Sequence, residues 1–319
     1  MTNQRHVILG TGPLGQAVMR ELRQRGATVR MVNRSGRRGE IPDAVEVMAG
    51  DAYSADSVQA LTAGAAVVYQ CAQPEYYEWT TKFHPLQAAI VEGVSAHKDV
   101  KLIVGENLYM YGEVNGPIHE GLPYYAHTRK GKIRAEMAES LLAAHRSGKI
   151  RVAMARGSDF FGPGVLGSSM GDRVFYPLMA GKPAQVAGRL DVPHSMTYID
   201  DFGKALVILG EREEALGQAW HVPNDAPLTQ QQFIDLIGQE LGRPVKVNAM
   251  GKFMMRIGGL FIRPAREIVE MMYEFEKPFV VDSSKFERAF GMKATPTREA
   301  IRATVAWFRA HPHIEGKTT

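Results

Sequence analysis

Apolar residues follow two different spacings over the first 107 residues of the chain. Compact apolar runs, which favour buried strands, alternate with segments whose apolar residues recur every three or four positions, as on one face of a helix. The runs predict strands at residues 6–10, 28–33, 45–51, 65–72 and 100–107. The other segments predict helices after residue 10, from about Ser54 to Leu61 and near Leu86 to Ala96. Such alternation indicates an α/β fold with a doubly wound parallel sheet, which binds ligands at the carboxyl ends of its strands.

The first apolar run ends in a glycine-rich turn. It comprises Gly10, Thr11, Gly12, Pro13, Leu14 and Gly15. In this G-x-G-x-x-G spacing the first glycine permits a tight turn, the second lets a pyrophosphate approach the backbone, and the third lets helix and strand pack closely. The helix N-terminus then faces the phosphates with its exposed N–H groups and dipole. Because the turn joins a strand to a helix, we interpret it as a dinucleotide site rather than a merely structural turn.

The second strand ends about 20 residues beyond the glycines, at Asn33, Arg34 and Ser35. An NAD-specific site places an acidic residue here, on a ribose hydroxyl. This chain has no carboxylate to repel a 2′-phosphate, and a guanidinium can bind that phosphate through paired, charge-assisted hydrogen bonds. Arg37 and Arg38 follow closely. The pattern therefore favours NADP over NAD, with a solvated basic turn as the alternative.

The next three strand ends carry small or polar residues where a cofactor is expected. They are Asp51 and Ala52 after the third strand, Ala72 and Gln73 after the fourth, and Asn107 after the fifth. Asp51 could accept a hydrogen bond from the adenine amino group, and the alternative is a solvated turn aspartate.

Composition narrows the class of protein. The 319 residues are 45% hydrophobic and 23% charged, and no apolar run of about 18 residues suggests a membrane span. The net charge of +4 is dispersed rather than clustered, which favours a small anionic ligand over nucleic acid. The single cysteine, Cys71, cannot form an internal disulfide, and no histidine or cysteine pattern has metal-ligand spacing. We expect a cytoplasmic protein without a metal site.

Six segments appear in a characteristic order. They are GTGPLG, AGDA, ENLYMYG, RGSDFFGPGV, HSMTYIDDFGKAL and WHVPNDAPLTQQQFIDLIGQELG. Together they resemble the extended short-chain dehydrogenases/reductases of the NAD(P)-dependent epimerase/dehydratase superfamily. The resemblance implies a Rossmann-type NADP-binding domain over residues 1–160, to which later segments return. It also implies a smaller, mainly substrate-binding α+β part over residues 161–319.

The resemblance implies a catalytic triad from which this sequence departs. Family members use a tyrosine as acid or base, a lysine four residues later that lowers the phenol's pKa and holds the nicotinamide ribose, and a serine or threonine after the fifth strand. Alignment with the family places Lys132 at the lysine, Thr128 at the tyrosine and Asn107 at the serine or threonine. A threonine hydroxyl is too weak an acid to replace a phenol. We therefore expect Tyr125 or Tyr109 to donate the proton, and Asn107 to bind a substrate carbonyl.

Other residues bear on the proton donor and on the substrate. Tyr111, His127 and His194 are further titratable candidates, although such residues more often pack or face solvent. Family members that act on nucleotide sugars usually place an arginine before the MTYIDD segment, whereas this chain has GRLDVPHS there, with Arg189 and Asp191. A nucleotide sugar is therefore less expected than a small, fairly apolar molecule.

Apolar residues beyond position 159 indicate either a pocket wall or a packed core, and packing is the commoner role of such stripes. They are Phe160, Phe161, Met170, Phe175, Tyr176 and the stretches at residues 250–261 and 271–279.

These observations predict an NADP(H)-dependent oxidoreductase that acts on the carbonyl or activated alkene of a small, fairly apolar molecule. A non-catalytic NADP(H)-binding redox sensor and a nucleotide-sugar epimerase or dehydratase are the alternatives. The resemblance further implies a homodimer, formed by the helix near residue 90 and the helix that carries Lys132.

Overall fold

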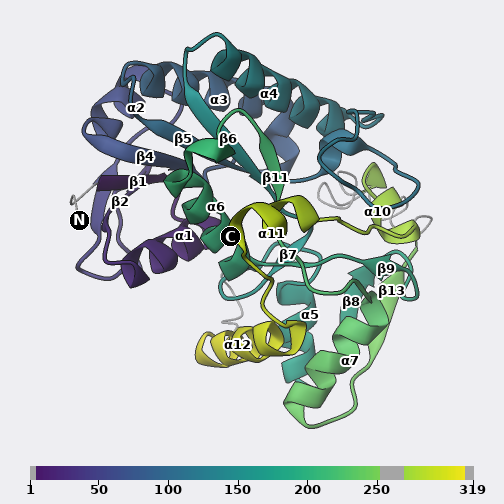
Figure 1. Ribbon diagram of the computed structural model, residues 1–319. Coiled ribbons are helices and arrows are strands. Elements are labelled where there is room, and N and C mark those ends of the chain that lie inside the picture. The colour runs from purple at the N-terminus through teal and green to yellow at the C-terminus, as the bar shows by residue number, and fades with distance from the viewer. Residues whose placement is uncertain (1–4, 252–268, 313–319) are drawn as a thin grey trace.

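A seven-stranded parallel sheet forms the centre of the computed structural model, which describes residues 5–251 and 269–312 (Figure 1). Every neighbouring pair in this sheet is parallel. In spatial order the strands are β3 (Glu46–Ala49), β2 (Thr28–Asn33), β1 (Arg5–Leu9), β4 (Ala65–Gln70), β5 (Lys101–Glu106), β6 (Arg151–Arg156) and β11 (Ala219–His221). The order confirms the doubly wound α/β sheet that the alternating pattern predicts.

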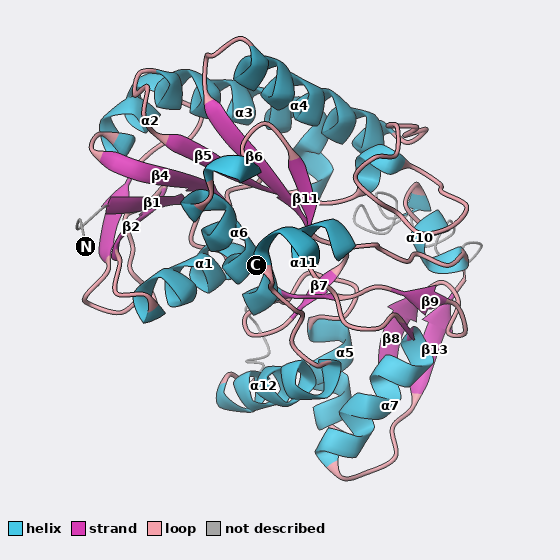
Figure 2. Cartoon of the chain, in the orientation of Figure 1, coloured by secondary structure: helices cyan, strands magenta, loops and turns pink. Residues whose placement is uncertain are grey.

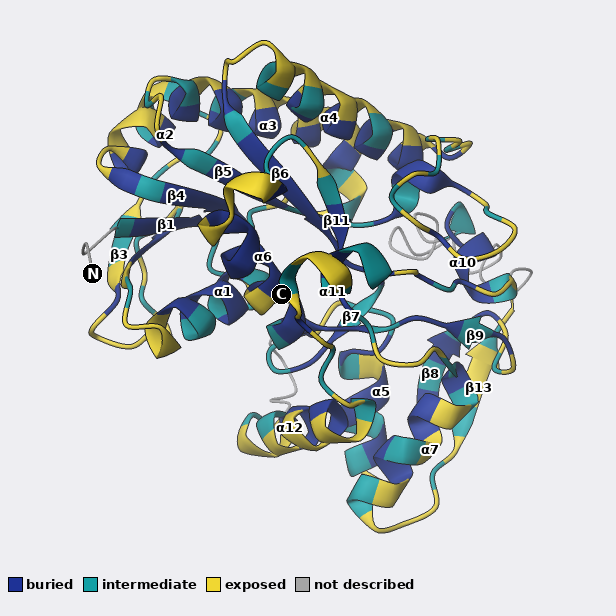
Figure 3. Ribbon diagram, viewed as in Figure 1, coloured by how far each residue is buried: buried dark blue, intermediate teal, exposed yellow. Residues whose placement is uncertain are grey.

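Helices cover both faces of this sheet (Figure 2). One face carries α1 (Pro13–Gln24) and α6 (Ile199–Glu211), and the other carries α2 (Ala55–Thr62), α3 (Trp79–Ser95) and α4 (Arg129–Arg146). A separate hydrophobic cluster lies under each layer, so the inner faces of α3, α4 and α6 are buried while outer faces of α3 and α4 are exposed (Figure 3). Helix α6 approaches α1 so closely that a Cβ atom at Gly203 would lie 2.6 Å from the backbone of Ala17.

Helix α3 begins at Trp79, about two turns before the start expected near Leu86. Pro85 lies inside the helix, and an interior proline removes a hydrogen bond at a cost of about 3 kcal/mol. The extra turns bury Trp79 and Phe83 in the core, at 5% and 1% exposure. Burying two such side chains contributes about 3 to 6 kcal/mol, which offsets the cost of the proline.

The remaining chain forms three two-stranded sheets and a helical layer below the central sheet in Figure 1. The strand pairs are β7 (Phe160–Phe161) with β10 (Thr197–Tyr198), β8 (Ala184–Ala187) with β13 (Val247–Met250), and β9 (Pro193–His194) with β12 (Leu228–Thr229). The helices of this lower layer are α5 (Asp172–Met179), α7 (Gln230–Leu241) and α12 (Thr297–Ala310), whereas α10 (Tyr273–Glu276) and α11 (Ser284–Phe290) lie nearer to β11, against which α11 packs. No helix among the described residues is long and apolar enough to cross a membrane.

A third hydrophobic cluster holds this lower layer together. Phe161, Met170 and Phe175 are each at most 2% exposed within it, and Tyr176 packs against it, so these residues form core rather than a pocket wall. Most of the apolar stretch at residues 250–261 lies outside the described residues.

The chain changes direction in the sheet between β1 and β4. From β1 it builds outward through β2 and β3, and then returns to the other side of β1 as β4. The loops that follow β1 and β4 therefore leave toward opposite sides of the sheet. A crevice forms at such a point, outside the carboxyl ends of the strands.

Candidate functional site

A cavity of about 640 Å³, the main cavity, lies at the carboxyl ends of β1, β2, β4 and β5. It brings together most of the residues selected from the sequence. These are Gly10, Thr11, Gly12, Pro13, Leu14, Asn33, Arg34, Asp51, Ala52, Ala72, Gln73, Asn107 and Tyr109. Segments that are distant in sequence complete its wall, at residues 157–160, 165–168, 274 and 279.

The three glycines of the first loop have different geometric roles. Gly10 has a φ of 110°, a region that side chains rarely adopt. A Cβ atom at Gly15 would lie 2.2 Å from the carbonyl oxygen of Gly10, so only glycine permits this contact between loop and helix. At Gly12 nothing lies within 4 Å of that position, which leaves open space beside the N-terminus of α1. No side chain caps this N-terminus, so the residues present fit the pyrophosphate of a dinucleotide.

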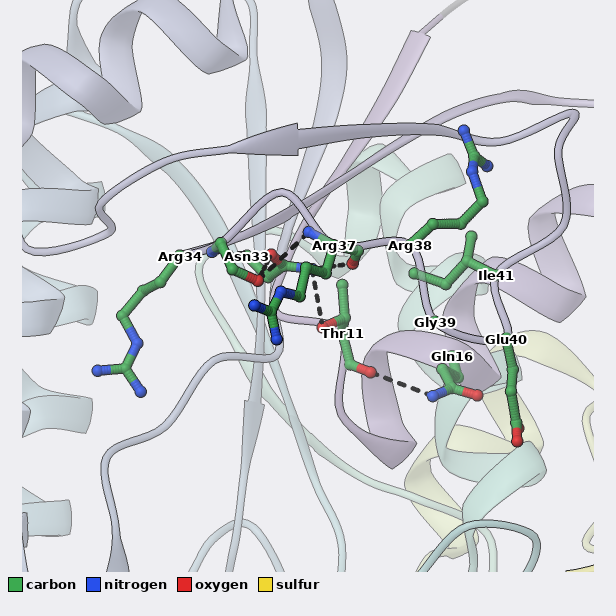
Figure 4. Close-up of a pocket in the computed structure, with 10 residues that line it drawn as sticks. Thr11, Gln16, Asn33, Arg34, Arg37, Arg38, Gly39, Glu40 and Ile41 are labelled. Atoms are coloured by element: carbon green, nitrogen blue, oxygen red, sulfur yellow. Dashed lines mark hydrogen bonds between the residues drawn. The ribbon is translucent and has the colours of Figure 1, made fainter.

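The basic loop at the end of β2 (residues 33–38) borders a second cavity of about 470 Å³ (Figure 4). Ser35 is part of its lining. Asn33 organises this loop, because its Oδ1 accepts from the backbone N–H and the hydroxyl of Ser35, at 3.1 and 3.2 Å. Its Nδ2 donates to the carbonyl of Arg37 at 2.9 Å. Arg38 donates to the carbonyls of Pro42 and Val45, and it points away from Arg34 in Figure 4.

Arg34 also borders a third cavity, of about 740 Å³, with Asp51, Tyr53 and Lys82. The carboxylate of Asp51 accepts from the backbone N–H of Tyr53 at 2.9 Å, as in an aspartate-capped turn. One Asp51 oxygen thus holds the turn, and the residue still lines both cavities.

Three of the five expected catalytic residues lie outside the main cavity. Tyr125 is 75% exposed and Lys132 is exposed on the outer face of α4. Thr128 is buried, but its hydroxyl caps α4 by accepting from the N–H of Gly131 at 3.1 Å. Of the phenols and amides predicted to act, only Tyr109 and Asn107 line the main cavity.

Two residues of α4 that the alignment overlooked occupy its inner face. Lys130 and Arg134 are four residues apart and are 1% and 5% exposed. Arg134 lines the main cavity, donates from Nε to Oδ1 of Asn107 at 3.0 Å, and lies over the rings of Trp79 and Phe83. The ammonium of Lys130 lies 4.5 Å from the ring centroid of Tyr76 and 3.0 Å from a carboxylate oxygen of Glu270. Residues with i, i+4 spacing lie on one face of a helix, so both side chains face inward, and Arg134 reaches the main cavity.

Tyr111 belongs to a buried structural network beside the cavity rather than to its wall. Arg156 donates to Glu106 at 3.0 Å and to the hydroxyls of Tyr111 and Tyr124 at 2.6 Å each. The Tyr111 hydroxyl in turn lies 2.9 Å from Nε2 of His221. Burial, followed by the charge of Arg156, lowers the pKa of His221 to about 3, so His221 is neutral at pH 7. The network fixes the end of β5, from which Asn107 projects.

Five side chains that line the main cavity have a buried oxygen atom without a hydrogen-bond partner among the described residues. They are Gln70, Glu106, Ser158, Ser168 and Glu274. Buried polar atoms in native proteins are nearly always bonded. A cluster of unsatisfied oxygens around one cavity therefore indicates that a polar ligand binds there.

The remaining sequence candidates contact other protein groups. His127 is exposed and packs on the ring of Tyr273. His194 is buried, with Nε2 2.9 Å from the carboxylate of Asp159. Arg189 forms an exposed two-point ion pair with Asp191, at 2.9 and 2.7 Å, and it does not line the main cavity.

The chain is similar to known proteins over most of its length. An uncharacterized protein of Sinorhizobium fredii, y4nL, is 21% identical over 294 residues, which cover 82% of this chain and 80% of that protein. UDP-glucuronic acid 4-epimerase from Bacillus cereus, solved with UDP-glucuronic acid and NAD, has a TM-score of 0.78 and 16% identity, over 97% of this chain and 100% of that chain.

A second structural relative is dTDP-glucose 4,6-dehydratase from Bacillus anthracis, in complex with NAD. Its TM-score is 0.77 at 14% identity, over 96% of this chain and 97% of that chain. The model of the NAD dependent epimerase/dehydratase family matches residues 7–222. This match spans β1 to β11, and the chain therefore belongs to the NAD dependent epimerase/dehydratase family of extended short-chain dehydrogenases/reductases.

Proposed function

We propose that the protein is an NADP(H)-dependent oxidoreductase that acts on the carbonyl or activated alkene of a small, fairly apolar molecule. One observation carries this proposal: a single cavity joins the glycine loop, the acid-free end of β2 and a largely apolar inner wall. The inner wall comprises Trp79, Phe83, Leu86, Phe160, Val165, Leu166, Phe202 and Phe279. Such a wall suits an apolar substrate body, and the few polar groups among it orient the reacting group.

The preference for NADP rests on this chain's own residues. The two structural relatives contain NAD, which supports a nicotinamide dinucleotide in general. At the end of β2, however, Asn33 stands where an NAD site places a carboxylate. Arg34 and Arg37 border the second cavity, which Asn33 also lines, and can bind a 2′-phosphate through charge-assisted hydrogen bonds.

Arg134 and Asn107 would act next to the nicotinamide. The bound dinucleotide would supply or accept a hydride. Arg134 provides the fixed positive charge that the family's lysine would provide, and its bond to Asn107 holds both side chains in place. Since Oδ1 of Asn107 already accepts from Arg134, the Nδ2 amide is the part that can donate to a substrate carbonyl. Such a donor stabilises the negative charge that develops on the oxygen.

A nucleotide-sugar epimerase or dehydratase is the second candidate, favoured by the similarity to the enzymes from Bacillus cereus and Bacillus anthracis. In this chain Asp191 already neutralises Arg189, the arginine nearest to the expected phosphate-binding position. A redox sensor without turnover is the third candidate, because the family tyrosine is missing.

Three assays separate these candidates. Fluorescence titration compares NADPH with NADH, and we expect tighter binding of NADPH. Loss of NADPH absorbance is then followed with a panel of ketones, aldehydes and enones, and we expect turnover of apolar members. UDP-glucose and UDP-glucuronic acid are incubated in parallel with NAD, and epimerised or dehydrated products are sought. Products from the nucleotide sugars alone would refute the proposal, and NADPH binding without any turnover would favour the sensor.

A further inference from the structure

Glu274 is an acidic residue in the wall of the main cavity that has no counterpart in the family triad. It lies on α10, is 1% exposed, and has an Oε1 atom without a hydrogen-bond partner among the described residues. Two backbone bonds fix the chain that follows it. Arg189 donates to the carbonyl of Phe275 at 2.9 Å, and Phe279 donates to that of Pro193 at 2.9 Å. The carboxyl group is thus held in position beside the cavity.

Asp159, the neighbouring acidic residue, already contacts the imidazole ring of His194. Nδ1 of His194 lies 3.1 Å from the backbone carbonyl of Glu274, and a carbonyl can only accept, so Nδ1 carries a proton. Nε2 of the same ring lies 2.9 Å from Oδ2 of Asp159. That contact requires one proton, carried by either the ring or the carboxyl. Asp159 and His194 therefore form a closed pair, whereas Glu274 has no ion-pair partner among the described residues.

The two phenols in the wall are weaker acids than their ordinary pKa implies. Burial raises the pKa of Tyr76 and of Tyr109, and the charge of Asp159 raises both further. The nearby ammonium of Lys130 faces the ring of Tyr76 and is paired with Glu270. Among the described residues, no cation lowers the pKa of these two phenols toward neutral pH, as the family's lysine does for its tyrosine.

We infer that Glu274 is the catalytic residue that donates the proton during carbonyl reduction and accepts it in the reverse direction. The inference rests on the proposed function. In the reduction, a hydride from the dinucleotide forms a C–H bond at the carbonyl carbon, and the C=O π pair moves to oxygen. The O–H bond of Glu274 breaks, the alkoxide takes its proton, and the resulting carboxylate regains a proton from water. Hydride plus proton convert the ketone into an alcohol, and the dinucleotide leaves oxidised.

The surroundings keep this acid in the required form. The groups that face it are Asp159, His194, Tyr76, Tyr109 and Tyr273. Burial, followed by the charge of Asp159, raises the pKa of Glu274 well above its ordinary value. A raised pKa extends the pH range in which the carboxyl group is protonated, and the protonated form is the one that a general acid needs.

The test compares Glu274→Gln with Glu276→Gln, a control on the same helix that does not line the cavity. NADPH titration first shows that each variant binds cofactor, and turnover is then measured with the best carbonyl substrate of the panel. We expect Glu274→Gln to lose about 10² to 10⁴-fold in kcat with unchanged NADPH affinity, the range for a general acid. The control should keep its turnover.

The pH profile adds a second readout. Because reduction needs the protonated acid, kcat/KM should be full below the pKa of Glu274 and fall as pH rises through it. Glu274→Gln should lack this decline. If Glu274→Gln does not bind NADPH, Glu274→Asp decides: a shifted alkaline limb supports the role, and an unshifted limb overturns it. Turnover that survives in Glu274→Gln refutes this role alone, whereas absence of turnover in the unmodified protein refutes the proposed function and this role together.

Discussion

Replacing Asn33 by aspartate should reverse the cofactor preference while leaving the basic loop intact. Oδ1 of Asn33 accepts the two bonds from Ser35, and an aspartate oxygen can accept the same bonds. The two bonds that Nδ2 donates are lost, to the carbonyl of Arg37 at 2.9 Å and to Oγ1 of Thr11 at 3.4 Å. The substitution therefore adds one negative charge to the place where we expect the 2′-phosphate, with little change in geometry.

The size of the effect follows from this charge. Two unit charges about 5 Å apart interact by about 3 kcal/mol at an effective dielectric constant of about 20. Screening by Arg34 and Arg37 reduces this repulsion, so we expect NADPH binding to weaken by about 1.5 to 3 kcal/mol, or about 10- to 150-fold. NADH has a ribose hydroxyl there, which can donate to the new carboxylate, and a gain of about 1 kcal/mol would tighten its binding about fivefold.

Fluorescence titration of both cofactors against Asn33→Asp and Asn33→Ala tests this reasoning. The alanine variant also loses the contacts of Asn33, but it adds no charge, so it should weaken NADPH and NADH to a similar extent. If Asn33→Asp weakens NADPH no more than Asn33→Ala does, the 2′-phosphate does not bind at this loop.

Three further predictions follow from the positions of α3 and α4. Lys132→Gln should leave the Kd of NADPH within about twofold because Lys132 is exposed. Arg134→Gln should weaken the binding of NADPH and NADH about tenfold or more through loss of a charged hydrogen bond. Titrations that give the opposite order would restore Lys132 as the ribose ligand. Thr128→Val should lower the free energy of unfolding by about 1 kcal/mol through loss of the helix cap, and a loss of turnover without a fall in Tm would contradict this structural role. Sedimentation velocity at micromolar concentration should show a dimer that associates through α3 and α4, and a monomer alone would exclude it.

The cofactor half of the main cavity could be predicted from sequence because each part is local. A glycine spacing, a strand and the residue that ends it lie close together in the chain, and the parallel sheet then brings all the strand ends to one edge. One cavity therefore brings together residues from the ends of four strands, namely Gly12, Asn33, Asp51 and Gln73.

The inner half could not be predicted in this way. Glu274 reaches the cavity only because backbone bonds tie its segment to the chain around Arg189 and Pro193. The sequence allows the stretch at residues 271–279 to be either a pocket wall or a packed core. Met271 and Met272 are buried, whereas Phe279 lines the main cavity. The sequence does hold one indication of the site, which is the position of Glu274 within an apolar stretch. A carboxyl group is seldom buried unless it has a partner or a function.

The helical register decides which residues of α4 face the main cavity. A shift of two residues turns a side chain by about 200° around a helix, which separates the exposed Lys132 from the buried Lys130 and Arg134. Matching residue type to the family favoured a lysine, whereas the inner position holds an arginine. A threonine three residues before a backbone N–H that it can accept from is typical of a helix N-cap, and Thr128 has this relation to Gly131. A threonine engaged in this bond stands at the start of the helix, and its hydroxyl does not project from the inner face. The capping pattern therefore indicates that the inward-facing pair begins after Thr128, at Lys130.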